Sequence, residues 1–229
     1  MIDYSVVIPV YNEEESLDPL MQELEVHIQR LEGSYEIVFV NDGSSDRSLT
    51  ILERFQMNHP ECIRIINLSG RKKQTLALCE GLYAAQGRVV ITLDADLQND
   101  PADIPALIKK MDEGYDVVCG WRKNRMDTPL KMALSKLGNI LQRLFTGMKI
   151  HDISCTLRAY KKECIDQLHL TWEGQHRFIP LLLAQKGFKI GEIISHHRKR
   201  QHGYSKYSHK RIFKVMLDFF KIIFSKGRQ

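Results

Sequence analysis

Apolar positions along the chain follow two patterns that alternate. Short continuous apolar runs are typical of strands buried on both faces of a parallel sheet, whereas apolar residues that recur every three or four positions are typical of amphipathic helices. The short runs cover residues 5–10, 36–40, 63–68, 89–93 and 115–120. The helical patterns cover residues 16–33, 47–58, 75–86 and 101–113. This alternation predicts an α/β fold with a mostly parallel central sheet and right-handed crossovers.

The second half of the chain is less regular. Further helices are expected at residues 130–146 and 177–186, and further strands at 151–160 and 190–195. Residues 196–207 then form a basic segment without a strong preference for either regular structure. We interpret its residues 197–207 as a lid that closes over an anionic ligand. A solvated run of charge is the alternative interpretation.

The last segment, residues 210–226, has the pattern of an amphipathic helix. Its apolar stripe comprises Ile212, Val215, Met216, Phe219, Phe220 and Ile223. Such a helix can lie in a membrane interface, pack against a second copy in a homodimer, or pack on its own chain. The pattern leaves these three possibilities open. We therefore expect a main domain over residues 1–207 and a basic C-terminal helix over residues 208–229.

Charge and cysteine content narrow the class of protein. The net charge of +5 is concentrated near the C-terminus, because residues 196–229 hold ten Lys and Arg and a single acid. Such a tail indicates an anionic partner, either phosphate or lipid headgroups. Nucleic acid is disfavoured because no nucleic-acid-binding motif accompanies the charge. The five cysteines include no C-x-x-C pair, so neither a disulfide framework nor a zinc site made of thiolates is indicated.

Signals for export or membrane insertion are not recognisable in the sequence. The N-terminus lacks the basic and apolar regions of a signal peptide. No apolar run approaches the roughly 18 residues that a membrane-spanning helix needs. We expect a cytoplasmic protein with reduced thiols.

Two carboxylates follow the apolar run at residues 89–93. Asp94 and Asp96 are two positions apart, so on an extended chain they point the same way, with Gln98 next on that side. Carboxylate and amide oxygens suit Mg²⁺ or Mn²⁺, which usually take further ligands from substrate phosphates. The pattern predicts a metal held together with a diphosphate at the carboxyl edge of the sheet. A turn with two solvated acids is the alternative.

Two earlier strand ends carry residues that suit a nucleoside. Glu13 and Asp42 cannot bind a diphosphate directly, but their carboxylates can accept hydrogen bonds from ribose hydroxyls or a base N–H. Tyr11 can stack on a base. Because ligands of open α/β sheets bind beyond the carboxyl ends of the strands, these residues are expected near Asp94. The alternative is that the acids cap helices.

These motifs resemble a known family. V-V-I-P-V-Y-N-E-E, V-F-V-N-D-G-S-S-D and T-L-D-A-D-L-Q-N-D-P look like the signatures of family 2 inverting glycosyltransferases, which have the Rossmann-like GT-A fold. Among these the chain is most similar to polyprenyl-phosphate glycosyltransferases of the dolichol-phosphate mannose synthase type. H-D-I-S-C-T-L-R-A-Y and R-Q-H-G-Y-S-K-Y are similar to later family motifs, so the likeness runs over residues 4–207. The chain departs from the family at Gly70–Lys73 and at Cys155, where relatives often have N-F-G and Gly.

The resemblance implies a role for each matching position. Residues expected to hold the donor nucleoside are Pro9, Tyr11, Glu13, Val40 and Asp42. Residues expected around the diphosphate and its Mg²⁺ or Mn²⁺ are Asp94, Ala95, Asp96 and Gln98, of which all but Ala95 would be metal ligands. Residues expected on phosphate groups are Arg122, Arg200 and Lys206. The implied activity is a metal-dependent hexosyltransferase that uses a UDP- or GDP-sugar and inverts the anomeric carbon.

Which further residues are expected to be catalytic depends on the chemistry of the acceptor. A polyprenyl-phosphate oxygen is already anionic and needs no strong base, so the task is to position two anions, for which Arg122, Lys131 and Arg158 are candidates. A sugar hydroxyl needs a base, and Asp152 is the best candidate. The first reading predicts a peripheral enzyme at the inner face of the membrane. The alternatives are a soluble family 2 enzyme that glycosylates a cell-surface glycan, and a nucleotide-sugar-binding subunit without turnover.

Overall fold

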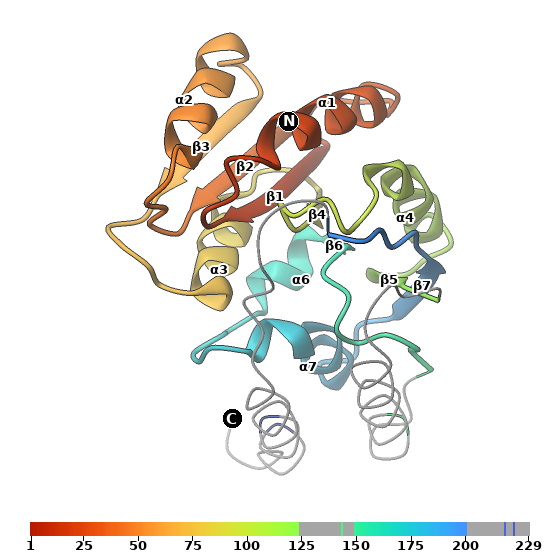
Figure 1. The fold of residues 1–229 in the computed structure, drawn as a ribbon. Helices are drawn as coiled ribbons and strands as arrows, with labels where there is room; N and C mark the ends of the chain where they lie inside the picture. The colour runs from red at the N-terminus through yellow and green to blue at the C-terminus, as the bar shows by residue number, and fades with distance from the viewer. Residues whose placement is uncertain (124–142, 144–148, 201–217, 219–221, 223–229) are drawn as a thin grey trace.

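Helices cover both faces of one seven-stranded sheet in the described part of the chain (Figure 1). This computed structural model describes residues 1–123, 143, 149–200, 218 and 222. The strands are β1 (Tyr4–Val10), β2 (Tyr35–Asn41), β3 (Ile63–Asn67), β4 (Val89–Thr92), β5 (Val117–Trp121), β6 (Arg158–Lys161) and β7 (Ile190–Ile194). The α-helices are α1 (Leu17–Ile28), α2 (Ser48–Asn58), α3 (Gln74–Ala84), α4 (Ile104–Met111), α6 (Lys162–Asp166) and α7 (Ile179–Gln185). Short 3₁₀ turns, η1 (Pro101–Asp103) and η2 (Gln175–Phe178), lead into α4 and α7.

The sheet is mostly parallel, as predicted. Its strand order is β3-β2-β1-β4-β6-β5-β7, and only β6 runs antiparallel to its neighbours β4 and β5 among these strands. The prediction of a strand over residues 151–160 is wrong in extent, because β6 covers only Arg158–Lys161. The polar residues before β6 use their side chains in tertiary hydrogen bonds, described below, and do not extend the strand.

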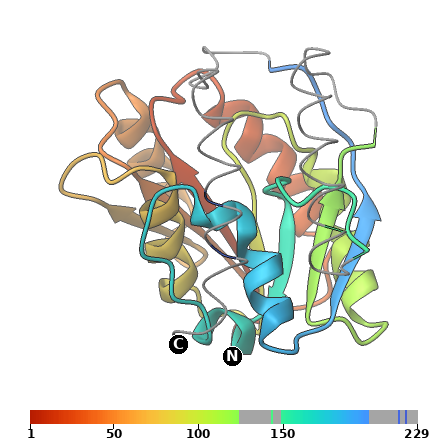
Figure 2. The ribbon, with the colours of Figure 1, turned by 90° about the horizontal axis from the view of Figure 1, so that it is seen from below.

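The core has two layers, one on each face of the sheet. In β1, Val6, Ile8 and Val10 pack with α1, α2 and α4, whereas Val7 faces α3, α6 and α7. Both sides of the central strands are therefore buried, which explains the continuous apolar runs in the sequence. Figure 2 shows the second layer, with α3, α6 and α7 in front of the sheet.

A close approach fixes α3 on the sheet. A Cβ atom at Gly81 would collide with Val7 and lie 2.8 Å from Cγ2 of Val40. Glycine therefore lets the helix lie directly on β1 and β2. Because α3 follows a parallel strand, its first residue, Gln74, lies at the carboxyl edge of the sheet, where the candidate site is found.

Several sequence-based predictions fall outside the described residues. These are most of the helix over 130–146, the lid beyond residue 200, the domain boundary at 207, and most of the helix over 210–226. In the described part, no helix combines the length and the apolar character needed to cross a bilayer.

Candidate active site

The chain turns sharply after β4 and brings its two acids together. β4 ends at Thr92, and Leu97 adopts a left-handed conformation with φ of 59°. The chain is therefore not extended through Asp94 and Asp96, contrary to the prediction. The two acids lie in and beside a turn in which Oδ1 of Asp96 accepts the backbone N–H of Gln98 at 3.1 Å.

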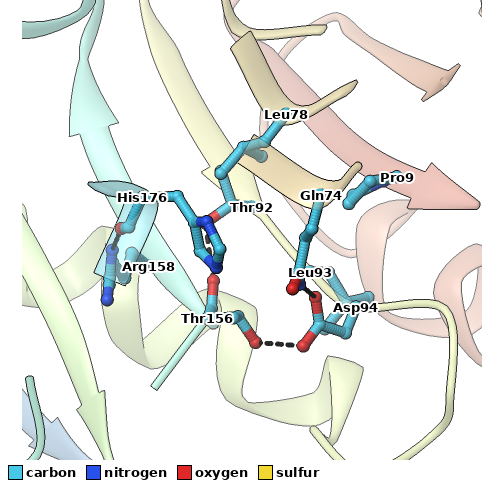
Figure 3. Close-up of a pocket in the computed structure, with 9 residues that line it drawn as sticks. All are labelled: Pro9, Gln74, Leu78, Thr92, Leu93, Asp94, Thr156, Arg158 and His176. Atoms are coloured by element: carbon cyan, nitrogen blue, oxygen red, sulfur yellow. Dashed lines mark hydrogen bonds between the residues drawn. The ribbon is translucent and has the colours of Figure 1, made fainter. Parts of the chain in front are cut away.

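Asp94 is held by side chains from two other segments (Figure 3). Its Oδ2 accepts the hydroxyl of Thr156 at 2.7 Å, and its Oδ1 accepts the amide of Gln74 at 3.2 Å. Thr156 is itself fixed, because its Oγ1 accepts Nδ2 of Asn99 at 3.0 Å and its carbonyl accepts the hydroxyl of Thr92 at 2.6 Å. The carboxylate therefore has a defined orientation. The pocket beside it is lined by Pro9, Gln74, Leu78, Thr92, Leu93, Asp94, Thr156, Arg158 and His176.

The electrostatics of this turn favour a bound cation. Burial and, next in size, the negative charge of Asp96 raise the pKa of Asp94 to about 6, with a smaller contribution from Glu13. The hydrogen bond from Thr156 and the charge of Arg122 act in the opposite direction. Carboxylates that repel each other in this way gain from a dication between them.

A strap, defined here as residues 196–200, crosses this turn. His196 donates its backbone N–H to Oδ2 of Asp103 at 2.7 Å, and its Nδ1 lies 2.8 Å from Oδ1 of the same residue. Further along, the guanidinium of Arg200 lies 2.5 Å from Oδ2 of Asp96. Arg200 was expected on a donor phosphate, and the structure places it on a carboxylate at the same site. The first residues of the predicted lid are thus docked on the body.

Asp42 and Tyr11, the predicted nucleoside contacts, follow β2 and β1 at this same edge. Oδ1 of Asp42 accepts the backbone N–H groups of Lys72 and Lys73 at 2.5 and 3.1 Å. Burial raises the pKa of Asp42, and these N–H groups oppose that effect. The guanidinium carbon of Arg71 lies 4.0 Å from the ring centroid of Tyr11. The loop that replaces the N-F-G of relatives therefore lies against both predicted nucleoside contacts.

The other residues predicted to contact the donor differ in which of their atoms are accessible to a ligand. Pro9 lines the pocket beside Asp94. The side chains of Val40 and Ala95 are buried in the two core layers, so only their backbone atoms remain for a ligand. Glu13 lies close enough to Asp94 to raise its pKa.

On the acceptor side, Asp152 and Arg122 form a buried ion pair. Arg122 donates to both carboxylate oxygens, at 2.7 and 3.0 Å, and Asp152 is 2% exposed. Arg122 also donates to Oγ of Ser154 at 2.9 Å. Asp152 is therefore a structural partner of Arg122 in this arrangement.

Arg158 has a different environment from the one expected. It is 2% exposed and donates to the backbone carbonyls of Ile153, His176 and Arg177. Its guanidinium therefore joins the segment before β6 to η2. The remaining predicted cations, Lys131 and Lys206, lie outside the described residues.

Sequence reasoning missed the residues that hold the site together. These are Gln74, Asn99 and Thr156, together with a buried contact of 2.6 Å between Oγ1 of Thr75 and Nδ1 of His176. The only signal for Gln74 was its place at the start of the helix after the third strand. Thr156 lies in the motif H-D-I-S-C-T-L-R-A-Y, but the sequence does not indicate which residue its side chain contacts.

Comparisons with known proteins agree with the motifs. Residues 5–168 match the family described as glycosyl transferase family 2. The chain is 37% identical to dodecaprenyl-phosphate galacturonate synthase of Rhizobium johnstonii, over 97% of this chain and 67% of that protein. It is 40% identical to undecaprenyl-phosphate 4-deoxy-4-formamido-L-arabinose transferase of Pseudomonas syringae, over 93% of this chain and 63% of that protein. The chain thus spans about two thirds of the length of these relatives.

Solved structures confirm the predicted fold. Glucosyl-3-phosphoglycerate synthase of Mycobacterium tuberculosis, in complex with Mn²⁺, uridine diphosphate and phosphoglyceric acid, is similar with a TM-score of 0.72 and 16% identity. The match covers 97% of this chain and 78% of that one. The same enzyme with Mg²⁺ and uridine diphosphate gives a TM-score of 0.70 and 16% identity, over 96% of this chain and 79% of that one. At this identity the likeness concerns the fold alone.

Proposed function

Because the chain belongs to glycosyl transferase family 2, we propose that it transfers a sugar from a nucleotide-sugar donor to a polyprenyl phosphate, with inversion. The observation that carries the proposal is the pair of crowded carboxylates, Asp94 and Asp96, at the carboxyl edge of the sheet. Two relatives that match over more than nine tenths of this chain are named for sugar transfer to dodecaprenyl or undecaprenyl phosphate.

The donor set fits a divalent metal. Asp94 and Asp96 offer hard oxygen ligands, and each carboxylate oxygen can accept more than the one hydrogen bond described above. Gln98, half-exposed after the turn, is the third candidate ligand. Mg²⁺ or Mn²⁺ held there would offset the charge of the leaving nucleoside diphosphate. Neighbours of the same fold were solved with either ion and uridine diphosphate, which supports this assignment.

The acceptor side of the site favours a phosphate over a hydroxyl. A hydroxyl acceptor requires a base within hydrogen-bond reach, and the candidate Asp152 is buried against Arg122. An acceptor phosphate needs no base, only positioning beside the donor and compensation of its charge. Arg122 is near enough to lower the pKa of Asp94, and the guanidinium of Arg200 lies 2.5 Å from Oδ2 of Asp96, so both are candidates for this role. We include Lys131 and Lys206 in this role on the motif resemblance alone.

A lipid acceptor sets where the reaction takes place. Because polyprenyl phosphate resides in the bilayer, we propose that the active site works at the inner face of the membrane, with the protein associated peripherally. The basic excess after residue 196 supports contact with anionic headgroups.

Transfer of labelled sugar tests the proposal directly. The full chain is incubated with a panel of UDP- and GDP-sugars, undecaprenyl phosphate in detergent and Mn²⁺ or Mg²⁺, and labelled lipid is extracted. We expect one donor to label the lipid, and excess chelator to abolish labelling. Asp96→Asn should lower the rate by at least about a hundredfold, as losses of transition-state charge stabilisation do. Asp18→Asn, an exposed acid paired with Arg54, is the matched control.

Three outcomes would contradict the proposal. Donor binding without transfer to any acceptor would indicate a nucleotide-sugar-binding subunit. Transfer to a sugar hydroxyl but not to the lipid would indicate a soluble enzyme of the same family. Full activity of Asp96→Asn, or in chelator, would remove the metal from the mechanism.

A further inference from the structure

A second group of metal-binding side chains lies at the opposite edge of the sheet. Ligand atoms of His59, Glu61 and Cys62 lie within 4.8 Å of one another. All three residues belong to the loop between α2 and β3, just before β3 begins at Ile63. This places them at the amino edge of the parallel strands, away from Asp94 and Asp96.

Glu25 of α1 lies beside this group. Its Oε1 lies 3.2 Å from Nε2 of His59. The group of three therefore offers one imidazole, one carboxylate and one thiol, and Glu25 is a partner of the imidazole. Side-chain exposures of 42% for His59 and 32% for Glu25 leave an ion free to enter.

The three side chains are spaced closely enough to share one ion. With metal–ligand distances of about 2.0–2.2 Å for N and O and about 2.3 Å for S, neighbouring ligands of a tetrahedral zinc site lie roughly 3.3–3.6 Å apart. Here the ligand atoms of His59, Glu61 and Cys62 lie within 4.8 Å of one another, with 3.9 Å between Sγ of Cys62 and Oε1 of Glu61.

The local charge also favours a cation. In the described part of the chain, neither Glu25 nor Glu61 forms an ion pair with a lysine or arginine. A cation bound by His59, Glu61 and Cys62 would offset the negative charge of these two carboxylates.

We propose that His59, Glu61 and Cys62 bind a zinc-class divalent ion, with Glu25 orienting the imidazole of His59. Sulfur and imidazole ligands select such an ion over Mg²⁺ and Ca²⁺. On binding, the S–H bond of Cys62 breaks, the proton leaves to solvent, and the electron pair of sulfur forms the metal–sulfur bond, so nothing is oxidised or reduced. The ion would fix the α2–β3 loop, which contacts α1 through His59 and Glu25, and so stabilise this layer of the fold.

Cobalt substitution tests the site without reference to catalysis. Co²⁺ bound to a thiolate gives a charge-transfer absorption in the near ultraviolet, which oxygen ligands do not give. Cys62 is the one cysteine of the chain that is not buried, so we expect one equivalent of Co²⁺ to produce this band and Zn²⁺ to remove it. The band should be absent in Cys62→Ser and weakened in His59→Gln.

The catalytic acids provide the control. Asp96→Asn should keep the band, because it alters only the site at the carboxyl edge. Zn²⁺ should raise the melting temperature of the wild-type chain and of Asp96→Asn, but not that of Cys62→Ser. Absence of the band at saturating Co²⁺ and pH 8, or its persistence in Cys62→Ser, would overturn the proposal.

Discussion

Asp94 depends on Thr156 for its orientation, although the two residues are 62 positions apart. The hydroxyl both donates to the carboxylate and accepts from Asn99. Because Thr156 acts here through the carboxylate of Asp94, we treat it as a positioning residue. Its effect should therefore appear in metal affinity before any sugar is transferred.

We predict that Thr156→Val weakens Mn²⁺ binding to the free enzyme by about tenfold, the lower end of the range for a lost supporting hydrogen bond at a metal site. Valine keeps the shape of threonine but removes the donor to Asp94. Electron paramagnetic resonance of free Mn²⁺ measures the affinity without donor or acceptor. Thr156→Ser, which retains the hydroxyl, should bind like the wild type. Equal affinity of the valine variant would show that Gln74 alone orients Asp94.

The sequence predicted the positions of some site residues but not the contacts of others. Asp94 and Asp96 were found because they follow an apolar run, a local signal. Arg158 was expected on a phosphate, but its guanidinium lies on three carbonyls, because β6 and η2 meet in space. No local pattern encodes that meeting. Contacts such as those of Thr156 and Arg158 therefore became visible only with the fold.

At the scale of elements, the strap is the part whose attachment depends on pH. The hydrogen bond to Asp103, followed by the attraction of its charge, raises the pKa of His196 above 6.5. Asp100 acts in the same direction, and Arg198 opposes it. Arg198 itself pairs with Glu23 at 2.7 Å and Asp100 at 2.5 Å, so the strap has two charged attachments before Arg200.

We predict that the His196–Asp103 attachment is strongest at low pH. A group whose pKa is raised by folding contributes fully below its unfolded value of 6.5, and this contribution is lost as the pH rises through the folded value. NMR titration of the His196 ring should give a pKa above 6.5. Asp103→Asn should lower it, while the asparagine oxygen still accepts the backbone N–H. An unchanged pKa in that variant would rule out Asp103 as the cause.

Elements with a strong local pattern were predictable, and the connections between them were less so. The strands and helices up to residue 121 appear within a few residues of their predicted bounds, because apolar runs and helical periods are local properties. In the sheet, β6 lies between β4 and β5. Its length was mispredicted because a strand of four residues is too short to show a clear hydrophobic pattern. Its antiparallel direction depends on where the chain returns to the sheet.

For the molecule as a whole, the sheet separates two proposed sites of different chemistry. Carboxylates crowd at its carboxyl edge around Asp94, and an imidazole, a carboxylate and a thiol lie together at its amino edge around His59 and Cys62. The acids of the first follow an apolar run in a recognisable motif. His59, Glu61 and Cys62 are also close in the sequence, but they match no common ligand spacing, and the contact of His59 with Glu25 arises only when α1 packs beside α2.

The proposed membrane contact involves residues 208–229. Of this segment the structure describes Asp218 and Ile222, both helical. Ile222 is 4% exposed and packs with Ile153, Phe178 and Leu181. At this point the segment therefore contacts the body of the protein. The partner of the apolar stripe around Phe220 is a question for experiment.

We predict that the protein binds anionic membranes through this segment. Residues 208–229 hold six Lys and Arg, and each basic residue near an anionic surface adds on the order of 1 kcal/mol. Aromatic side chains of the stripe can bury at the headgroup boundary. The full chain should therefore float with phosphatidylglycerol vesicles at low salt and less at high salt, because salt screens the attraction. Phe220→Glu should abolish flotation, whereas Gln29→Glu, the same charge change at an exposed position after α1, should not. If the wild type fails to float at low salt and forms a dimer that Phe220→Glu disrupts, the stripe instead binds a second copy.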